Sequence, residues 1–105
     1  MTRAVPATID SPELSSTVEV IANNSVALDC PVSGVPRPSV SWFREEVPIP
    51  GNASNVYILD GGRRLHINGV EVGQAGLYVC RAKNVAGQED KEYTLSVFGL
   101  SNFSD

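Results

Sequence analysis

Two cysteines, Cys30 and Cys80, stand fifty positions apart and constrain this chain more than any other feature. Structural metal sites use ligands in close pairs, so this spacing does not indicate a metal centre. The two residues could be buried thiols, but alternating strand-like segments surround both, and one long-range disulfide fits that pattern better. In the chain-entropy model such a bond is worth roughly 4 kcal/mol, and it persists only in an oxidising compartment.

Short alternating segments separated by turn residues run through the whole chain. Val26, Leu28 and Cys30, for example, alternate with Ala27 and Asp29, as in a strand with one buried face. The breaks between such segments contain Gly, Pro or Asn and lie at 34–38, 60–62, 73–76 and 84–87. This pattern predicts seven to nine short strands, and therefore an all-β sandwich or barrel.

Three further residues make the expected fold more specific. Trp42 lies twelve residues after Cys30, and Tyr78 lies two residues before Cys80, which is the spacing of a tyrosine corner. Leu65 belongs to the segment just before that corner. With these residues the chain resembles the I-set immunoglobulin family over about residues 5–98. The resemblance implies two packed antiparallel sheets with Greek-key connections, and a disulfide packed against the Trp42 indole.

Two loop motifs strengthen this resemblance, and one position departs from it. Gly34-Val35-Pro36-Arg37-Pro38 and Asn84-Val85-Ala86-Gly87 are both typical of I-set domains. Gln74, however, stands where the family usually has Asp. In the family that Asp commonly pairs with an upstream Arg, so a salt bridge from Arg63 or Arg64 is in doubt here.

The domain boundaries follow from length and composition. A chain of 105 residues with 42% apolar and 19% charged residues is expected to form one packed domain. We assign residues 5–98 to that domain, residues 1–4 to a start or linker sequence, and residues 99–105 to a linker or tail. We also expect this chain to be a fragment of a longer protein.

The net charge of −4, from eight basic and twelve acidic residues, excludes some partners. Nucleic-acid binding normally needs a concentrated basic patch, and no basic run occurs in the sequence. The apolar stretches are far shorter than the ~20 residues that cross a bilayer, so we expect no membrane insertion of this fragment. We therefore expect protein partners, including neighbouring immunoglobulin domains or a second copy.

The segment from Val56 to Ile67 is most similar to repeats of the hemicentin family of extracellular-matrix array proteins. This similarity implies a non-enzymatic adhesion and spacer module, located outside the cell in matrix or at the cell surface. Two alternatives stay open. One is an intracellular scaffold domain of a giant muscle-type protein, with reduced cysteines. The other is a ligand-binding module of a receptor ectodomain.

Three sequons for N-linked glycosylation occur, beginning at Asn23, Asn52 and Asn102. All three fall in expected turns or in the tail, where a bulky polar glycan is tolerated. The alternative is that these short motifs arise by chance. An oxidising compartment would suit both the disulfide and the sequons.

The sequence offers no candidate for catalysis, metal binding or a cofactor. His66, the single histidine, alternates with Leu65 and Ile67, so we expect a solvated strand residue. The acidic clusters Glu45-Glu46 and Glu89-Asp90-Lys91-Glu92 lack the spacing of a calcium loop. We expect both clusters to lie at hairpin ends as hydrated loops.

One group of apolar residues indicates a contact surface. If Trp42 and Tyr78 point into the core, then Phe43, Leu77 and Val79 point outward from adjacent strands. Clustered exposed apolar side chains can mark a site of protein contact. The alternatives are ordinary scattered exposure or coverage by a neighbouring domain.

Overall fold

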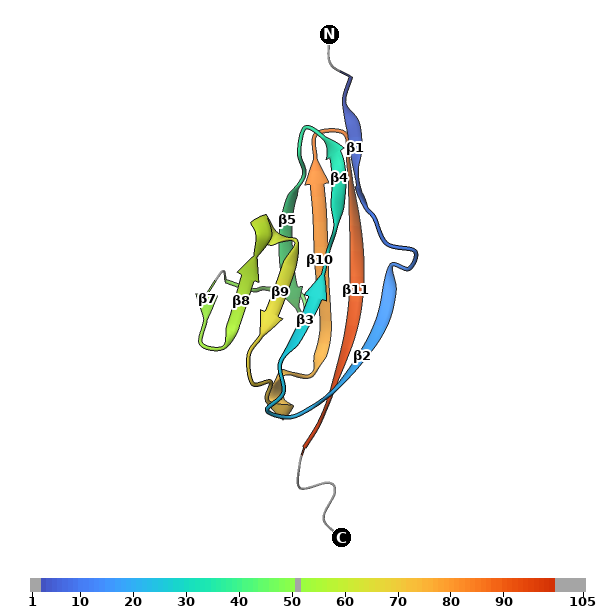
Figure 1. The fold of residues 1–105 in the computed structure, drawn as a ribbon. Helices are drawn as coiled ribbons and strands as arrows, with labels where there is room; N and C mark the ends of the chain where they lie inside the picture. The colour runs from blue at the N-terminus through green and yellow to red at the C-terminus, as the bar shows by residue number, and fades with distance from the viewer. Residues whose placement is uncertain (1–2, 51, 100–105) are drawn as a thin grey trace.

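The alternating segments of the sequence form a set of paired strands in a computed structural model that describes residues 3–50 and 52–99 (Figure 1). Two short 3-10 turns, η1 (Asp60–Gly62) and η2 (Val72–Gln74), interrupt the strands at glycine-containing breaks. The strands are β1 (Val5–Ile9), β2 (Ser15–Ile21), β3 (Val26–Asp29), β4 (Val32–Val35), β5 (Ser39–Arg44), β6 (Val47–Pro48), β7 (Asn52–Ala53), β8 (Val56–Leu59), β9 (Arg64–Ile67), β10 (Gly76–Asn84) and β11 (Gly87–Phe98).

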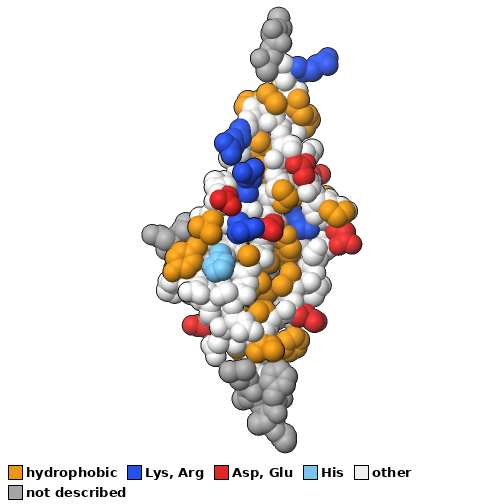
Figure 2. Space-filling view, viewed as in Figure 1, with side chains coloured by type: hydrophobic (Ala, Val, Ile, Leu, Met, Phe, Trp, Pro, Cys, Tyr) orange, Lys and Arg blue, Asp and Glu red, His pale blue; other side chains and the backbone are white. Residues whose placement is uncertain are grey.

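The strands form a sandwich. One sheet has the order β2-β11-β10-β5-β6, and the opposite layer contains β3-β9-β8-β7 together with the pair β1-β4. The chain passes directly from β3 through Cys30 and Pro31 into β4, so these two strands continue one another (Figure 1). Seen from the same side, the surface carries hydrophobic as well as charged side chains (Figure 2). The expected immunoglobulin-like sandwich is confirmed.

One strand pairing differs from the expected antiparallel sheets. β2 pairs in parallel with β11, from Ser15 opposite Glu92 to Ile21 opposite Phe98. The reason is that β1 and β2 belong to different layers: β1 pairs with β4, and residues 10–14 then carry the chain across to β11. Because the chain does not reverse direction on crossing, β2 meets β11 in parallel.

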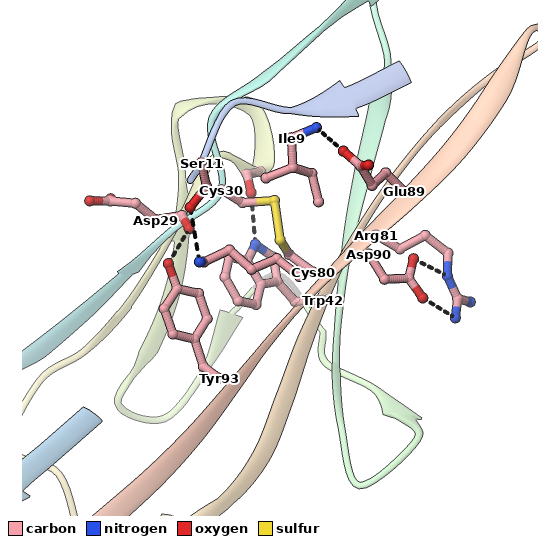
Figure 3. Close-up of a disulfide and its surroundings, with 12 residues drawn as sticks. Ile9, Ser11, Asp29, Cys30, Trp42, Cys80, Arg81, Glu89, Asp90 and Tyr93 are labelled. Carbon is pink, nitrogen blue, oxygen red and sulfur yellow. Dashed lines mark hydrogen bonds and ion pairs between the residues drawn. A yellow bond between two sulfur atoms is a disulfide. The ribbon is translucent and has the colours of Figure 1, made fainter. Parts of the chain in front are cut away.

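The core is built around the disulfide between Cys30 and Cys80, whose Cα atoms are 6.5 Å apart (Figure 3). Both cysteines are fully buried, as are Trp42 and Leu65. The Trp42 Nε1 atom donates a hydrogen bond to the Gly62 carbonyl at 2.7 Å, which satisfies the only polar atom of the indole. The disulfide and the indole thus tie both sheets together without leaving the indole donor unpaired.

Tyr78 forms the tyrosine corner that its spacing predicts. Its hydroxyl donates a 2.6 Å hydrogen bond to the Gln74 carbonyl, across the turn that precedes β10. Burial is the main cause that raises the pKa of Tyr78 above its ordinary value, and the nearby Arg44 opposes this shift. A neutral phenol is therefore favoured at this position.

The doubtful salt bridge at the base of the sandwich is replaced by other contacts. Arg64 pairs with Asp29 at 2.9 Å, on the neighbouring strand β3. The Gln74 side chain instead exchanges hydrogen bonds with the Asn55 side chain and accepts one from the Glu71 backbone. Gln74 therefore pairs with a neutral amide, while Arg64 pairs with a carboxylate elsewhere.

One acidic cluster lies elsewhere than expected. Glu45 and Glu46 do form a hairpin turn, but the hydrated-loop assignment for residues 89–92 is wrong. The β10–β11 hairpin has only two turn residues between Asn84 and Gly87, so β11 begins before residues 89–92. Lys91 therefore lies within a strand, and it is buried, with 4% of its surface exposed.

Candidate functional site

The predicted contact residues come together on the outer face of the Trp42-containing sheet. Phe43 on β5 lies directly opposite Val79 on β10, and Leu77 lies two residues from Val79 on the same strand. All three side chains are half-buried. They point away from the core, because the alternate positions on these strands hold the buried Trp42 and Tyr78. The alternation of these two strands therefore produces an apolar row on the outside of the sheet.

A charged pair borders this row. The Arg81 guanidinium lies 4.8 Å from the Phe43 ring centroid, which is the distance of a cation–π contact. It also binds Asp90 on β11 through two hydrogen bonds, at 3.1 and 3.2 Å (Figure 3). The carboxylate raises the pKa of Arg81 above its ordinary value through the hydrogen bond and through its charge. The pair holds the guanidinium against the aromatic ring.

The row and its border enclose a shallow hollow of about 400 Å³, which we call the contact face. It contains three carboxylates and one guanidinium, so the rim is acidic overall. Its lining residues are Phe43, Glu46, Leu77, Val79, Arg81, Asp90 and Glu92.

Reasoning from sequence missed Arg81, Asp90, Glu92 and Glu46 as parts of this face. A usable signal was present, because a two-residue hairpin between Asn84 and Gly87 places residue 81 opposite residue 90. The same register places residue 79 opposite residue 92. Glu46 could not be found in this way, because its position depends on how the β5–β6 turn folds.

The other predicted site residues lie outside the contact face. His66 on β9 is half-buried on the opposite sheet, opposite Tyr57, with ring centroids 6.5 Å apart. Asn23 is exposed in the turn after β2. Asn52 lies in β7, but its side chain falls outside the described residues, as does Asn102.

Within residues 3–50 and 52–99, no group of three or more His, Cys, Asp or Glu side chains is arranged to hold a metal ion. No helix in the same residues has the length and apolar character needed to cross a bilayer. The arrangement on the contact face offers apolar contact and ion pairing, which are the means of protein recognition.

Comparison with known proteins decides the family. The model of the immunoglobulin I-set domain matches residues 10–97, which is most of the chain. The chain belongs to the immunoglobulin I-set family. I-set domains are generally non-enzymatic modules that mediate protein–protein contacts.

Relatives of this I-set domain occur in several kinds of large protein. Mouse hemicentin-1 is 46% identical over 83 residues, which are 79% of this chain and 2% of hemicentin-1. Human hemicentin-1 is 40% identical over 101 residues, or 96% of the chain and 2% of that protein. The muscle M-line assembly protein unc-89 of Caenorhabditis elegans is 38% identical over 93 residues, or 84% of the chain and 1% of that protein. The chain thus spans a small part of each relative.

Solved structures show the same fold. A crystal structure of a mutant complex between titin M10 and an obscurin-like 1 immunoglobulin domain matches with a TM-score of 0.81 and 25% identity. The match covers 92% of this chain and 97% of the other. The titin M3 domain matches with a TM-score of 0.78 and 26% identity, over 90% of this chain and 98% of that domain.

Proposed function

We propose that this I-set domain is a non-enzymatic adhesion and spacer module of a secreted or cell-surface protein that contains many domains. The observation that carries the proposal is the contact face, where an apolar row lies beside a charged pair on one outer sheet surface. Aromatic and Arg side chains of this kind are enriched in protein interfaces. The similarity to hemicentins supports an extracellular array as the setting.

The shape of the domain supports the spacer role. β1 begins at one end of the long axis and β11 finishes at the other end (Figure 1). Each such module would therefore add to the length of an array. The Asn84 amide fixes the β1 end by donating hydrogen bonds to the carbonyls of Val5 and Pro36, at 2.8 and 2.9 Å.

The chemistry of the contact face supports one kind of partner. An apolar side chain of a partner protein would fill the hollow over Phe43 and Val79 and would remove their apolar surface from water. Lys or Arg residues around that side chain would meet Glu46 and Glu92 at the rim. We therefore propose a protein partner with a basic rim, on a neighbouring immunoglobulin domain or on another matrix protein.

The disulfide and the exposed Asn23 sequon support the proposed compartment. A buried disulfide persists in secreted proteins and is rare in the cytosol. Both features favour an extracellular location.

A bead-binding experiment tests the proposed contact. Beads coated with the secreted chain are applied to matrix deposited by cultured fibroblasts, and retention is counted under flow. Phe43→Asp, in the apolar row of the contact face, is expected to abolish retention. Leu59→Asp, a matched control on an exposed position of the opposite sheet, is expected to leave retention unchanged. Equal retention of the two folded variants, or no retention of the native chain, would contradict the proposal.

Two further settings rest on particular relatives. The similarity to unc-89 favours an intracellular scaffold of muscle, in which the cysteines would be reduced. The similarity to zebrafish vascular endothelial growth factor receptor 3, 36% identity over 80 residues, favours a receptor ectodomain as the setting. Measuring whether the chain folds with both thiols reduced separates the intracellular alternative from our proposal. Stable folding of the reduced chain would support the intracellular setting.

A further inference from the structure

A groove beside the end of β2 has both apolar and polar walls. Ile21 and Phe98 are neighbours in the last pair of the β2–β11 ladder, and 40% and 41% of their surfaces are exposed. Hydrophobic side chains are visible at this lower end of the molecule in Figure 2. The groove measures about 410 Å³, and its lining residues are Glu19, Val20, Ile21, Asn24, Ser25 and Phe98.

The turn beside this groove is exposed and hydrogen-bonded to the core. Asn24 N–H donates to the Ile21 carbonyl at 3.1 Å, which closes the turn, and Asn23 has a positive φ of 78°. Asn23 N–H donates to the Val70 carbonyl at 2.7 Å, and Val70 N–H donates to the Asn24 carbonyl at 2.8 Å. Because Val70 is fully buried, these two bonds anchor the turn to the core.

We propose that Asn23 carries an N-linked glycan and that its first sugar packs into this groove against Phe98 and Ile21. Asn23, Asn24 and Ser25 form a glycosylation sequon, and two of these three residues line the groove. The attachment point therefore adjoins the groove, and covalent attachment gives the sugar a high effective concentration there.

The chemistry of N-acetylglucosamine matches the two kinds of wall. One face of the pyranose ring carries mainly C–H groups, which suit the Phe98 ring and the Ile21 side chain. The hydroxyl and acetamido groups can bond the Glu19 carboxylate and the Asn24 amide. The sugar would cover apolar surface that water otherwise contacts, so it would stabilise the folded chain.

The modification rests on the proposed extracellular function, because only the secretory pathway supplies the donor. In that reaction the Asn23 Nδ2 atom loses a proton and forms a bond to C1 of the first sugar. The bond between C1 and the phosphate oxygen of a polyisoprenyl diphosphate oligosaccharide breaks, the lipid diphosphate leaves with the bonding electrons, and the proton from Nδ2 passes to solvent.

The test uses the chain secreted from cultured mammalian cells. Peptide mass spectrometry measures occupancy of Asn23, and an endoglycosidase then trims the glycan to one sugar. We expect Asn23 to be occupied, and the trimmed chain to unfold about 2–4 °C above the Asn23→Asp variant, which lacks the acceptor amide but keeps a side chain that tolerates the positive φ at this position. In a Phe98→Ser background this difference should vanish, whereas Leu59→Ser, at a similarly exposed position, should leave it intact.

The outcomes separate the two proposals. An unoccupied Asn23 in a secreted chain with an intact disulfide would overturn the glycan assignment and leave the extracellular function standing. An occupied Asn23 whose stabilisation persists in Phe98→Ser would overturn the packing of the sugar in the groove. Failure of the chain to leave the cell in oxidised form would overturn both proposals.

Discussion

Asn55 and Gln74 exchange two side-chain amide hydrogen bonds, each with a donor–acceptor distance of 2.9 Å. The Gln74 side-chain oxygen also accepts a 2.9 Å hydrogen bond from the Glu71 N–H. The main-chain carbonyl of Gln74 accepts a hydrogen bond from the Tyr78 hydroxyl. One uncharged residue thus joins the β7–β8 turn, the 3-10 turn η2 and the tyrosine corner. In I-set domains with Asp at this position, an ion pair would take the place of some of these hydrogen bonds.

Replacing Asn55 with Ala is expected to lower the free energy of unfolding by about 1–2 kcal/mol, because the Gln74 Nε2 atom loses its acceptor and the Gln74 Oε1 atom loses one of its two donors. Since both residues are uncharged, the loss should be the same at low and high salt concentration. Urea unfolding at both salt concentrations measures this. A loss that shrinks in high salt would indicate an ionic contact and contradict the account.

The pKa of Tyr78 is raised above its ordinary value of 10.0, mainly by burial. Between pH 10 and this higher value the folded chain holds a proton that the unfolded chain has released. The tyrosine therefore contributes stability below about pH 10 that is lost as pH rises further. Tyr78→Phe should cost about 1 kcal/mol at neutral pH and should flatten the decline above pH 10. An unchanged alkaline decline in stability would contradict this.

Lys91 is expected to hold the connection between β1 and β2. Its buried ammonium donates hydrogen bonds to Ser11 Oγ at 3.0 Å and to the Glu13 carbonyl, and it lies 4.9 Å from the Tyr93 ring centroid. Lys91→Met should cost about 2 kcal/mol, because Ser11 and Glu13 lose a charged donor.

Hydrogen exchange provides the more specific readout for Lys91. The Glu92 N–H bonds the Leu14 carbonyl at 2.9 Å, next to the lysine contacts. Its exchange should accelerate in Lys91→Met relative to the N–H of Cys80 in the core. Uniform acceleration of both amides would show a global loss of stability rather than release of this connection.

Gly62 and Gly61 form a matched pair for testing how tightly the Trp42 region is packed. Both have positive φ, but an added Cβ at Gly62 would lie 2.9 Å from the Val40 Cβ, whereas at Gly61 nothing lies within 4 Å. Gly61→Ala should cost about 1–2 kcal/mol from backbone strain. Gly62→Ala should cost about 3 kcal/mol or more, since overlap adds to strain. Equal costs by urea unfolding would contradict the packing.

The fold could be predicted from sequence because its determinants are local in pattern and specific in spacing. Alternation fixes which side chains of β5 and β10 point inward, and Trp42 and Tyr78 then identify the family. The same alternation placed Phe43, Leu77 and Val79 together on the outer face. These predictions needed no knowledge of loop conformation.

The features that could not be predicted depend on contacts between distant segments. Burial of Lys91 arises because residues 11–16 pass over β11, which no periodicity in either segment reveals. The amide pair of Asn55 and Gln74 joins two turns whose relative position depends on the whole sandwich. The groove beside Asn23 likewise requires the parallel pairing of β2 with β11, and the sequence pattern does not distinguish parallel from antiparallel pairing here.

The central claim is that the Cys30–Cys80 disulfide makes this I-set domain suited to an extracellular setting. The most direct measurement is the free energy of unfolding in urea, with the disulfide intact and with both cysteines reduced and kept reduced. The account predicts that reduction costs about 4 kcal/mol, a large part of the stability of such a domain. If the reduced chain is as stable as the oxidised chain, the domain would fold equally well in the cytosol and the claim would be contradicted.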